Sequence, residues 1–216
     1  MELVSLNNKE YIIRYIPKEP NTHLNFSFKG KRNYVHGTDI CNTLMNLLKD
    51  DLLNVNFDLS FHQMITSNIE LVSIKPSEEK LKFICKYINK NNERKILYGI
   101  ENENDITSRY KYDEEKITSL SILNLLKQEI ILKAQSPFSY IEDIVALNKF
   151  LLENLFNKEN SKWLFTRLQL MHIPFNNIYP LKLILRANFN FKLTKTEIFC
   201  NNKSIGFIYF SLINKK

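Results

Sequence analysis

Glycine and cysteine are scarce in this chain of 216 residues, and each scarcity excludes a class of site. No two glycines lie within six residues of each other, so neither a GxGxxG dinucleotide fingerprint nor a GxxxxGK[ST] phosphate loop is present. The four are Gly30, Gly37, Gly99 and Gly206. The three cysteines form no CxxC pair, which argues against a disulfide framework and a cysteine zinc site.

Long apolar runs are also missing. No stretch approaches the roughly 18 apolar residues that a membrane-spanning helix needs. The first residues, MELVSLNNKEYIIRYIPKEP, contain no apolar core of the kind found in secretory signal peptides. We therefore expect a reduced, cytoplasmic protein that does not enter a membrane.

The charge is basic, with 30 Lys and Arg against 23 Asp and Glu and a net charge of +7. Such a field favours a polyanionic partner: nucleic acid, coenzyme A or an acidic carrier protein. Nucleic-acid binding usually relies on clustered arginines among exposed aromatic residues. Here only six of the basic residues are arginines and they are scattered, so a nucleic-acid partner is not expected.

A weak internal repeat is the most informative feature of the sequence. Residues 39–49 and 140–156 both carry apolar residues at helical spacing and predict two helices. Thr38 is the predicted N-cap of the first helix, and Ser139-x-x-Glu142 predicts a capping box at the start of the second. Two unrelated stretches of one α+β domain are the alternative to duplication.

Strands follow each predicted helix. Apolar and polar residues alternate over residues 54–62, and residues 163–172 take the same place in the second half. Residues 67–74 align with residues 176–184, and each half closes with a predicted hairpin whose turn holds Asn92 or Asn202. The offset is nearly constant, because Asn68 and Asn177 are 109 residues apart and Asn92 and Asn202 are 110 apart.

The repeat divides the chain into a first unit of residues 1–104, a linker of residues 105–119 and a second unit of residues 120–216. The charged run of residues 101–116, ENENDITSRYKYDEEK, predicts a solvated connection. Residues 117–135 fit either a helix or a strand-rich crossover, and the pattern does not separate the two.

A helix followed by a long-stranded antiparallel sheet, occurring twice, resembles the tandem or double hotdog fold, an α+β architecture with two long central helices, each wrapped by an antiparallel sheet. RNYVHGTDICNTLMNLL (residues 32–48) looks like the segment of R-specific enoyl-CoA hydratases in which a His-Gly pair precedes the central helix. EPNTHLN (residues 19–25) is similar to their Asp-x-Asn-Pro-x-His stretch, with His23 at the His position. Lys18 stands where that stretch has Asp, and Pro20-Asn21 reverses its Asn-Pro order.

The resemblance implies an enzyme that acts on acyl thioesters of coenzyme A or an acyl carrier protein, without a cofactor. A dehydratase or hydratase of fatty-acid or polyketide-type biosynthesis is the first expectation. A hotdog thioesterase and a non-catalytic acyl- or protein-binding module are the alternatives. Because two hotdog units already form a pseudo-dimer, the chain is expected as a monomer or a homodimer.

The candidate catalytic residues, Tyr34, His36 and Asp39, surround the start of the first predicted helix. His36 titrates near neutral pH and is suited to move a proton at the substrate's α or β carbon. Asp39 is predicted either to orient His36 or to activate a water, and Tyr34 to donate a hydrogen bond to the substrate.

Four further residues are candidates for substrate binding. Gly37 and Thr38 start the helix, where free N–H groups stabilise the oxyanion of a thioester carbonyl and a glycine permits close approach. Capping and turn formation are the structural alternatives for both residues. Since paired hotdog units share a site, Glu142 or Asp143 is predicted to supply a carboxylate from the second unit. No pair of histidines has metal-ligand spacing, so no metal is expected.

Overall fold

The computed structural model describes residues 22–53, 55–156, 158, 160–174, 176 and 178–214. Lys18, Pro20, Asn21 and Asn177 lie outside the described residues. Within them the chain forms one 11-stranded sheet, a two-stranded sheet and three helices.

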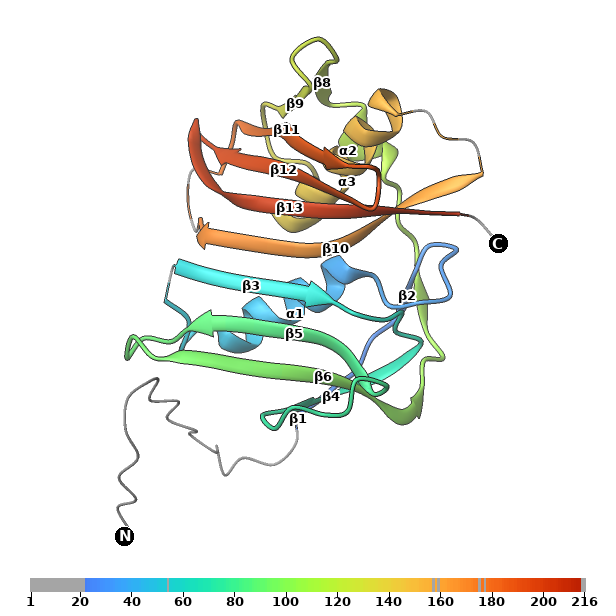
Figure 1. Cartoon of the computed structure of the whole chain (residues 1–216), viewed down its shortest axis with the longest axis vertical. Helices are drawn as coiled ribbons and strands as arrows, with labels where there is room; N and C mark the ends of the chain where they lie inside the picture. The colour runs from blue at the N-terminus through green and yellow to red at the C-terminus, as the bar shows by residue number, and fades with distance from the viewer. Residues whose placement is uncertain are drawn as a thin grey trace, which may run out of the picture.

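The large sheet runs through both halves of the chain in the order β1-β4-β6-β5-β3-β10-β13-β12-β11-β9-β8, and every neighbouring pair is antiparallel (Figure 1). The first half contributes β1 (Thr22–Leu24), β3 (Val55–Phe61), β4 (Ser67–Val72), β5 (Leu81–Ile88) and β6 (Arg94–Asp105). The second half contributes β8 (Ser121–Asn124), β9 (Glu129–Leu132), β10 (Ser161–His172), β11 (Leu181–Phe189), β12 (Leu193–Cys200) and β13 (Lys203–Asn214).

The two halves join where β3 pairs with β10. The alternation predicted over residues 54–62 is confirmed, because Phe57 and Leu59 are fully buried while their neighbours along β3 are not. Leu59 faces Leu168 of β10 across the ladder, and Phe57 faces Leu170. The apolar face of the first half therefore continues into the second without a break.

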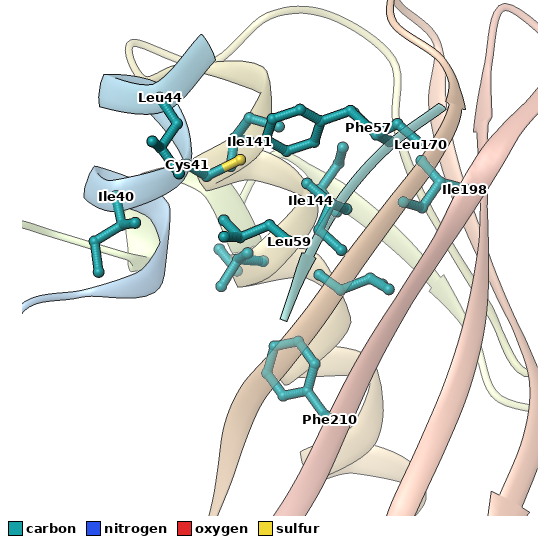
Figure 2. Packing of buried hydrophobic residues seen from close by; sticks show 14 of the residues in the cluster. Ile40, Cys41, Leu44, Phe57, Leu59, Ile141, Ile144, Leu170, Ile198 and Phe210 are labelled. Carbon is teal, nitrogen blue, oxygen red and sulfur yellow. The ribbon is translucent and has the colours of Figure 1, made fainter. Parts of the chain in front are cut away.

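Helices α1 (Gly37–Leu48) and α3 (Tyr140–Leu155) cover one face of this sheet and contact each other. Ile40, Cys41 and Leu44 of α1 are buried in the cluster that also holds Ile141 and Ile144 of α3 (Figure 2). One apolar core thus serves both halves. None of the described helices has the length and apolar character to span a membrane.

The predicted hairpins are confirmed, since Asn92 and Asn202 lie in the turns with positive φ of 61° and 63°. The strand orders differ, however. In the first half β5, the first strand of its hairpin, pairs with the central strand β3, whereas in the second half β13, the second strand, pairs with β10. Turn residues determine where a hairpin forms, but they do not determine which of its two strands pairs with the central strand. The constant spacing between the two halves therefore predicted the positions of the turns but not the difference in strand order.

The alignment of residues 67–74 with residues 176–184 holds only in part. The former segment contains β4, while regular strand in the latter begins at Leu181. Both strands lie on the far side of their hairpin from the β3–β10 junction, so the two segments take the same place in the sheet although their starts do not match.

The prediction of a solvated connection at residues 101–116 holds only in part, because most of the run is exposed but the run also forms regular structure. Strand β6 extends into this run, and β7 (Arg109–Tyr110) pairs in parallel with β2 (Phe28–Lys29). Within the same run, the Tyr112 ring packs against the core and meets Phe138 edge to face. The short helix α2 (Glu115–Thr118) follows, and then the β8–β9 hairpin, so residues 117–135 contain a strand hairpin rather than one helix.

Candidate active site

A cavity of about 760 Å³ opens at the boundary between the two halves. Its walls come from the loop before α1, the end of β3 and the loop after it, the middle of α3, and β10. Three of the predicted site residues, Tyr34, His36 and Gly37, line it. Thr38, Asp39, Glu142 and Asp143 are not among its lining residues.

The cavity combines an apolar interior with basic groups. Five Phe, Trp or Tyr side chains line it, and Phe61 and Phe165 meet edge to face with ring centroids 5.2 Å apart; the other three are Tyr34, Trp163 and Phe210. The four basic residues are Lys31, Arg32, Lys149 and Lys162, and the Lys162 ammonium lies 5.4 Å from the centre of the Tyr34 ring. Such walls suit a ligand with an apolar part and an anionic part.

His36 is the N-cap residue of α1, with extended backbone and no capping hydrogen bond from its side chain. The predicted N-cap, Thr38, is instead the second residue of the helix. Nδ1 of His36 lies 2.7 Å from Oγ1 of Thr38. Burial lowers the pKa of His36 well below its usual value, and the positive charges of Arg32, Lys29 and Lys149 lower it further. The imidazole is therefore neutral at pH 7.

The start of α1 is open to a ligand only in part. As at any helix start, the N–H groups of Gly37 and Thr38 have no acceptor within the helix, and the His36 side chain does not cap them. A Cβ on Gly37 would lie 2.7 Å from Cδ1 of Phe165 and 3.0 Å from Cε2 of Phe61. The space that the missing side chain leaves is thus filled by two rings of the cavity wall.

Lys29, which sequence reasoning did not single out, connects the starts of both long helices. It is fully buried, and its ammonium donates to Oγ1 of Thr38 at 3.0 Å, Oδ1 of Asp39 at 3.3 Å and Oε1 of Glu142 at 2.5 Å. The Tyr112 ring lies beneath it, with the centroid 4.1 Å from Nζ. Nothing in the segment FKGK (residues 28–31) marks Lys29 for this role, because its hydrogen-bond partners lie 9, 10 and 113 residues further along the chain.

Asp39 belongs to this buried cluster. Oδ1 accepts hydrogen bonds from Lys29 and, at 3.2 Å, from the Thr38 hydroxyl, and Oδ2 accepts one from the Tyr110 hydroxyl at 2.8 Å. No hydrogen bond joins Asp39 to His36 among the described residues, and Thr38 connects the two. Both carboxylate oxygens are thus already engaged.

Glu142 and Asp143 have different surroundings although they are adjacent in α3. The predicted capping box is confirmed, because Ser139 accepts from the Glu142 N–H and Glu142 accepts from the Ser139 N–H. Burial alone would raise the pKa of Glu142, but hydrogen bonds from Lys29 and Ser139 lower it overall. Glu142 therefore forms an ion pair with Lys29 of the first half, which also binds Asp39.

Asp143 is fully buried and faces its own half. It accepts hydrogen bonds of 2.5 Å from the Ser136 hydroxyl and from the Tyr179 hydroxyl. Burial raises its pKa, and these two hydrogen bonds oppose the rise without cancelling it. Its contacts do not connect it to His36.

Glu114 is a second residue that sequence reasoning missed, and it is the one carboxylate among the cavity's described lining residues. It accepts from Arg32 at 3.4 Å and from Lys149 at 3.0 Å, so it joins the loop before α1 to α3. The sequence offered no reason to select Glu114, because it lies in the charged run of residues 101–116 and most charges in such runs are solvated. No described group of three His, Cys, Asp or Glu residues could hold a metal ion.

No protein-family model matches the chain, and no curated protein matches it in sequence. Similar solved structures include the dehydratase domain of PpsC from Mycobacterium tuberculosis in complex with C12:1-CoA, at 6% identity and a TM-score of 0.45, covering 83% of this chain and 85% of that one. The dehydratase domain of RzxB from Pseudomonas fluorescens is 9% identical with a TM-score of 0.43, and the match covers 88% and 94% of the two chains.

A putative thioesterase II from Thermobifida fusca is 10% identical with a TM-score of 0.38, covering 85% of this chain and 87% of that one. At TM-scores below 0.5 the similarities assign no residue roles to this chain.

Proposed function

We propose that the chain is a tandem hotdog enzyme that acts on acyl thioesters, as a dehydratase or hydratase of 3-hydroxyacyl groups. One observation carries the proposal: a neutral His36 lines an apolar, basic-edged cavity at the uncapped start of a helix. A neutral imidazole is able to take a proton, and helix N–H groups stabilise the negative charge that forms on the carbonyl oxygen.

Dehydration follows from these groups without a cofactor. His36 removes the α proton of the 3-hydroxyacyl thioester, and the carbonyl oxygen gains charge near the N–H groups of Gly37 and Thr38. The C–O bond at the β carbon then breaks, and the hydroxyl leaves as water with the proton that His36 returns. Hydration is the reverse of these steps. Tyr34, at the cavity wall, is proposed to donate a hydrogen bond to the substrate.

The buried cluster has a supporting place in this proposal. Asp39 and Glu142 act through Lys29 and Thr38 rather than on the substrate, since their carboxylate oxygens are engaged there. Asp143 stabilises the start of α3. The four basic residues at the cavity favour a thioester of coenzyme A or of an acidic carrier protein, because both are anionic.

Thioester hydrolysis is the second candidate, and Glu114 is the observation that favours it. A carboxylate in the cavity is suited to activate a water that attacks the thioester carbonyl. Its ion pairs with Arg32 and Lys149 hold the carboxylate in place at the cavity wall.

The test is a mass-spectrometric assay of the purified protein with acyl-CoA and acyl-carrier thioesters, 3-hydroxyacyl forms included. Loss of water, or its addition to an enoyl form, is the expected result, and His36→Ala lowers the rate about 10²- to 10⁴-fold. His172→Ala is the matched control, since His172 is exposed on β10 and does not line the cavity.

Other outcomes separate the alternatives. Release of free acid that Glu114→Gln abolishes would replace the dehydratase with a thioesterase. Thioesters that raise the melting temperature without changing mass would indicate a binding module. Unchanged masses and unchanged melting temperature across the whole panel would overturn the acyl-thioester proposal.

A further inference from the structure

We propose that Lys29 and Thr38 are positioning residues that hold His36 in the tautomer with the proton on Nδ1, which leaves Nε2 as the base. The inference rests on the proposed function only where it assigns Nε2 of His36 the removal of the substrate's proton. The tautomer itself follows from counting protons in the buried cluster.

Every proton of the Lys29 ammonium has an acceptor. The group carries three protons and donates to three oxygens, those of Thr38, Asp39 and Glu142. An ammonium group can donate hydrogen bonds but cannot accept them. At the contact between Lys29 and Thr38, the threonine oxygen is therefore the acceptor.

The single proton of the Thr38 hydroxyl then decides the tautomer. Oγ1 of Thr38 also contacts Oδ1 of Asp39 at 3.2 Å and Nδ1 of His36 at 2.7 Å. An ionised carboxylate only accepts, so the Asp39 contact requires the Thr38 proton, and Nδ1 of His36 must then donate its own. If Thr38 donated to Nδ1 instead, two oxygens would face each other without a proton between them.

When Nδ1 of His36 donates to Thr38 and Thr38 donates to Asp39, every donor and acceptor along these hydrogen bonds has a partner. Thr38 accepts from Lys29 and His36 and donates to Asp39, which uses both of its lone pairs and its proton. Lys29 donates a charge-assisted hydrogen bond to the same Asp39 oxygen that accepts from Thr38, and such bonds are stronger than neutral ones. Nε2 of His36 has no hydrogen-bond partner among the described residues.

Thr38→Val is the most direct test, because it removes the hydroxyl and keeps the shape of a side chain that is 1% exposed. Nitrogen-15 spectra of the imidazole rings distinguish a protonated from a bare ring nitrogen, and loss of one set of signals in His36→Asn assigns His36. We expect the unsubstituted protein and Thr38→Ser to show a protonated Nδ1 and a bare Nε2. Thr38→Val is expected to show a mixture of tautomers.

Turnover gives the second measurement. With a 3-hydroxyacyl-CoA as substrate, Thr38→Val is expected to lower kcat about tenfold or more with little change in KM, and Thr38→Ser to restore most of it. Thr118→Val serves as control, since that threonine lies on α2 outside the cluster.

A protonated Nε2 in the unsubstituted protein overturns the proposal, and so does a spectrum of Thr38→Val that is identical to the spectrum of the unsubstituted protein. The expected spectra in a protein that converts no thioester would support the tautomer and overturn the enzymatic function alone.

Discussion

The starts of α1 and α3 lie on either side of one buried lysine and are built in opposite ways. At α3, Ser139 and Glu142 satisfy each other's N–H groups, and Asn42 of α1 donates to the Ser139 hydroxyl at 2.9 Å. At α1, His36 makes no such cap and lines a cavity instead. The side chains at the start of α3 therefore stabilise that helix, whereas the first N–H groups of α1 have no acceptor from the N-cap side chain.

Removing the cation that both starts share should have the largest effect on stability. Lys29→Met leaves the carboxylates of Asp39 and Glu142, which are 16% and 13% exposed, without their cation, so we expect the free energy of unfolding to fall by about 3 kcal/mol. Denaturant unfolding measures the loss. Lys116→Met, which breaks an exposed 4.0 Å pair with Asp113, should change it by less than about 0.5 kcal/mol. A loss below about 1 kcal/mol in Lys29→Met would show that the cluster does not hold the starts together.

Filling the space at the open start should come next. In Gly37→Ala the new Cβ would meet the Phe165 and Phe61 rings at 2.7 and 3.0 Å, so we expect a loss of about 1–3 kcal/mol from overpacking. Thermal unfolding measures it. Gly37→Ala combined with Phe165→Leu should recover part of the loss, and a double variant no more stable than Gly37→Ala would point to a backbone cause.

Exchanging the two N-cap residues for alanine tests the comparison directly. Ser139→Ala should cost about 1–2 kcal/mol, because the cap is lost together with the acceptor for Asn42. His36→Ala should cost less, since its side chain caps nothing, yet it should abolish turnover. The same denaturant titration applied to both variants, with the thioester assay beside it, gives the answer. Equal losses of stability would contradict the contrast between a closed and an open start.

The smallest expected effect is an opposite dependence on pH for two neighbours. The lowered pKa of Glu142 means that its contribution to stability is present above its ordinary pKa of 4.5 and is lost as the pH falls below that value. The raised pKa of Asp143 means that its contribution is present below its ordinary pKa of 3.8 and is lost as the pH rises through the folded-state pKa.

Unfolding free energies of Glu142→Gln and Asp143→Asn, compared with the unsubstituted protein between about pH 3 and pH 7, test this contrast. The cost of Glu142→Gln should shrink as the pH falls, and the cost of Asp143→Asn should shrink as the pH rises. Parallel trends in the two variants would show that burial does not raise the pKa of Asp143.

Local patterns predicted much of the fold because their causes are local. The Ser139-x-x-Glu142 box, the alternation along β3 and the asparagine turns at Asn92 and Asn202 each depend on a few adjacent residues, and all are confirmed. Helix α1 begins two residues before the predicted start because His36, rather than Thr38, takes the N-cap position. The order of strands within each half depends on long-range pairing and was not predictable from the turns.

The candidate site shows the same division. Tyr34, His36 and Gly37 reach the cavity as a local motif before a helix, which the sequence displays directly. Glu114 and Lys29 join the site from the connection between the halves and from the two-residue strand β2, where nothing in the neighbouring sequence marks them. Their contacts lie between 9 and 113 positions away along the chain.

By itself, the sequence determined two amphipathic helices with antiparallel strands after each, and a histidine at the start of the first helix. Only the tertiary structure decided that β3 and β10 merge the halves into one sheet, that Lys29 joins the two helix starts, and that Asp143 belongs to the core. Periodicity and capping depend on neighbours along the chain, whereas the partner of a buried charge depends on which distant segments exclude water around it.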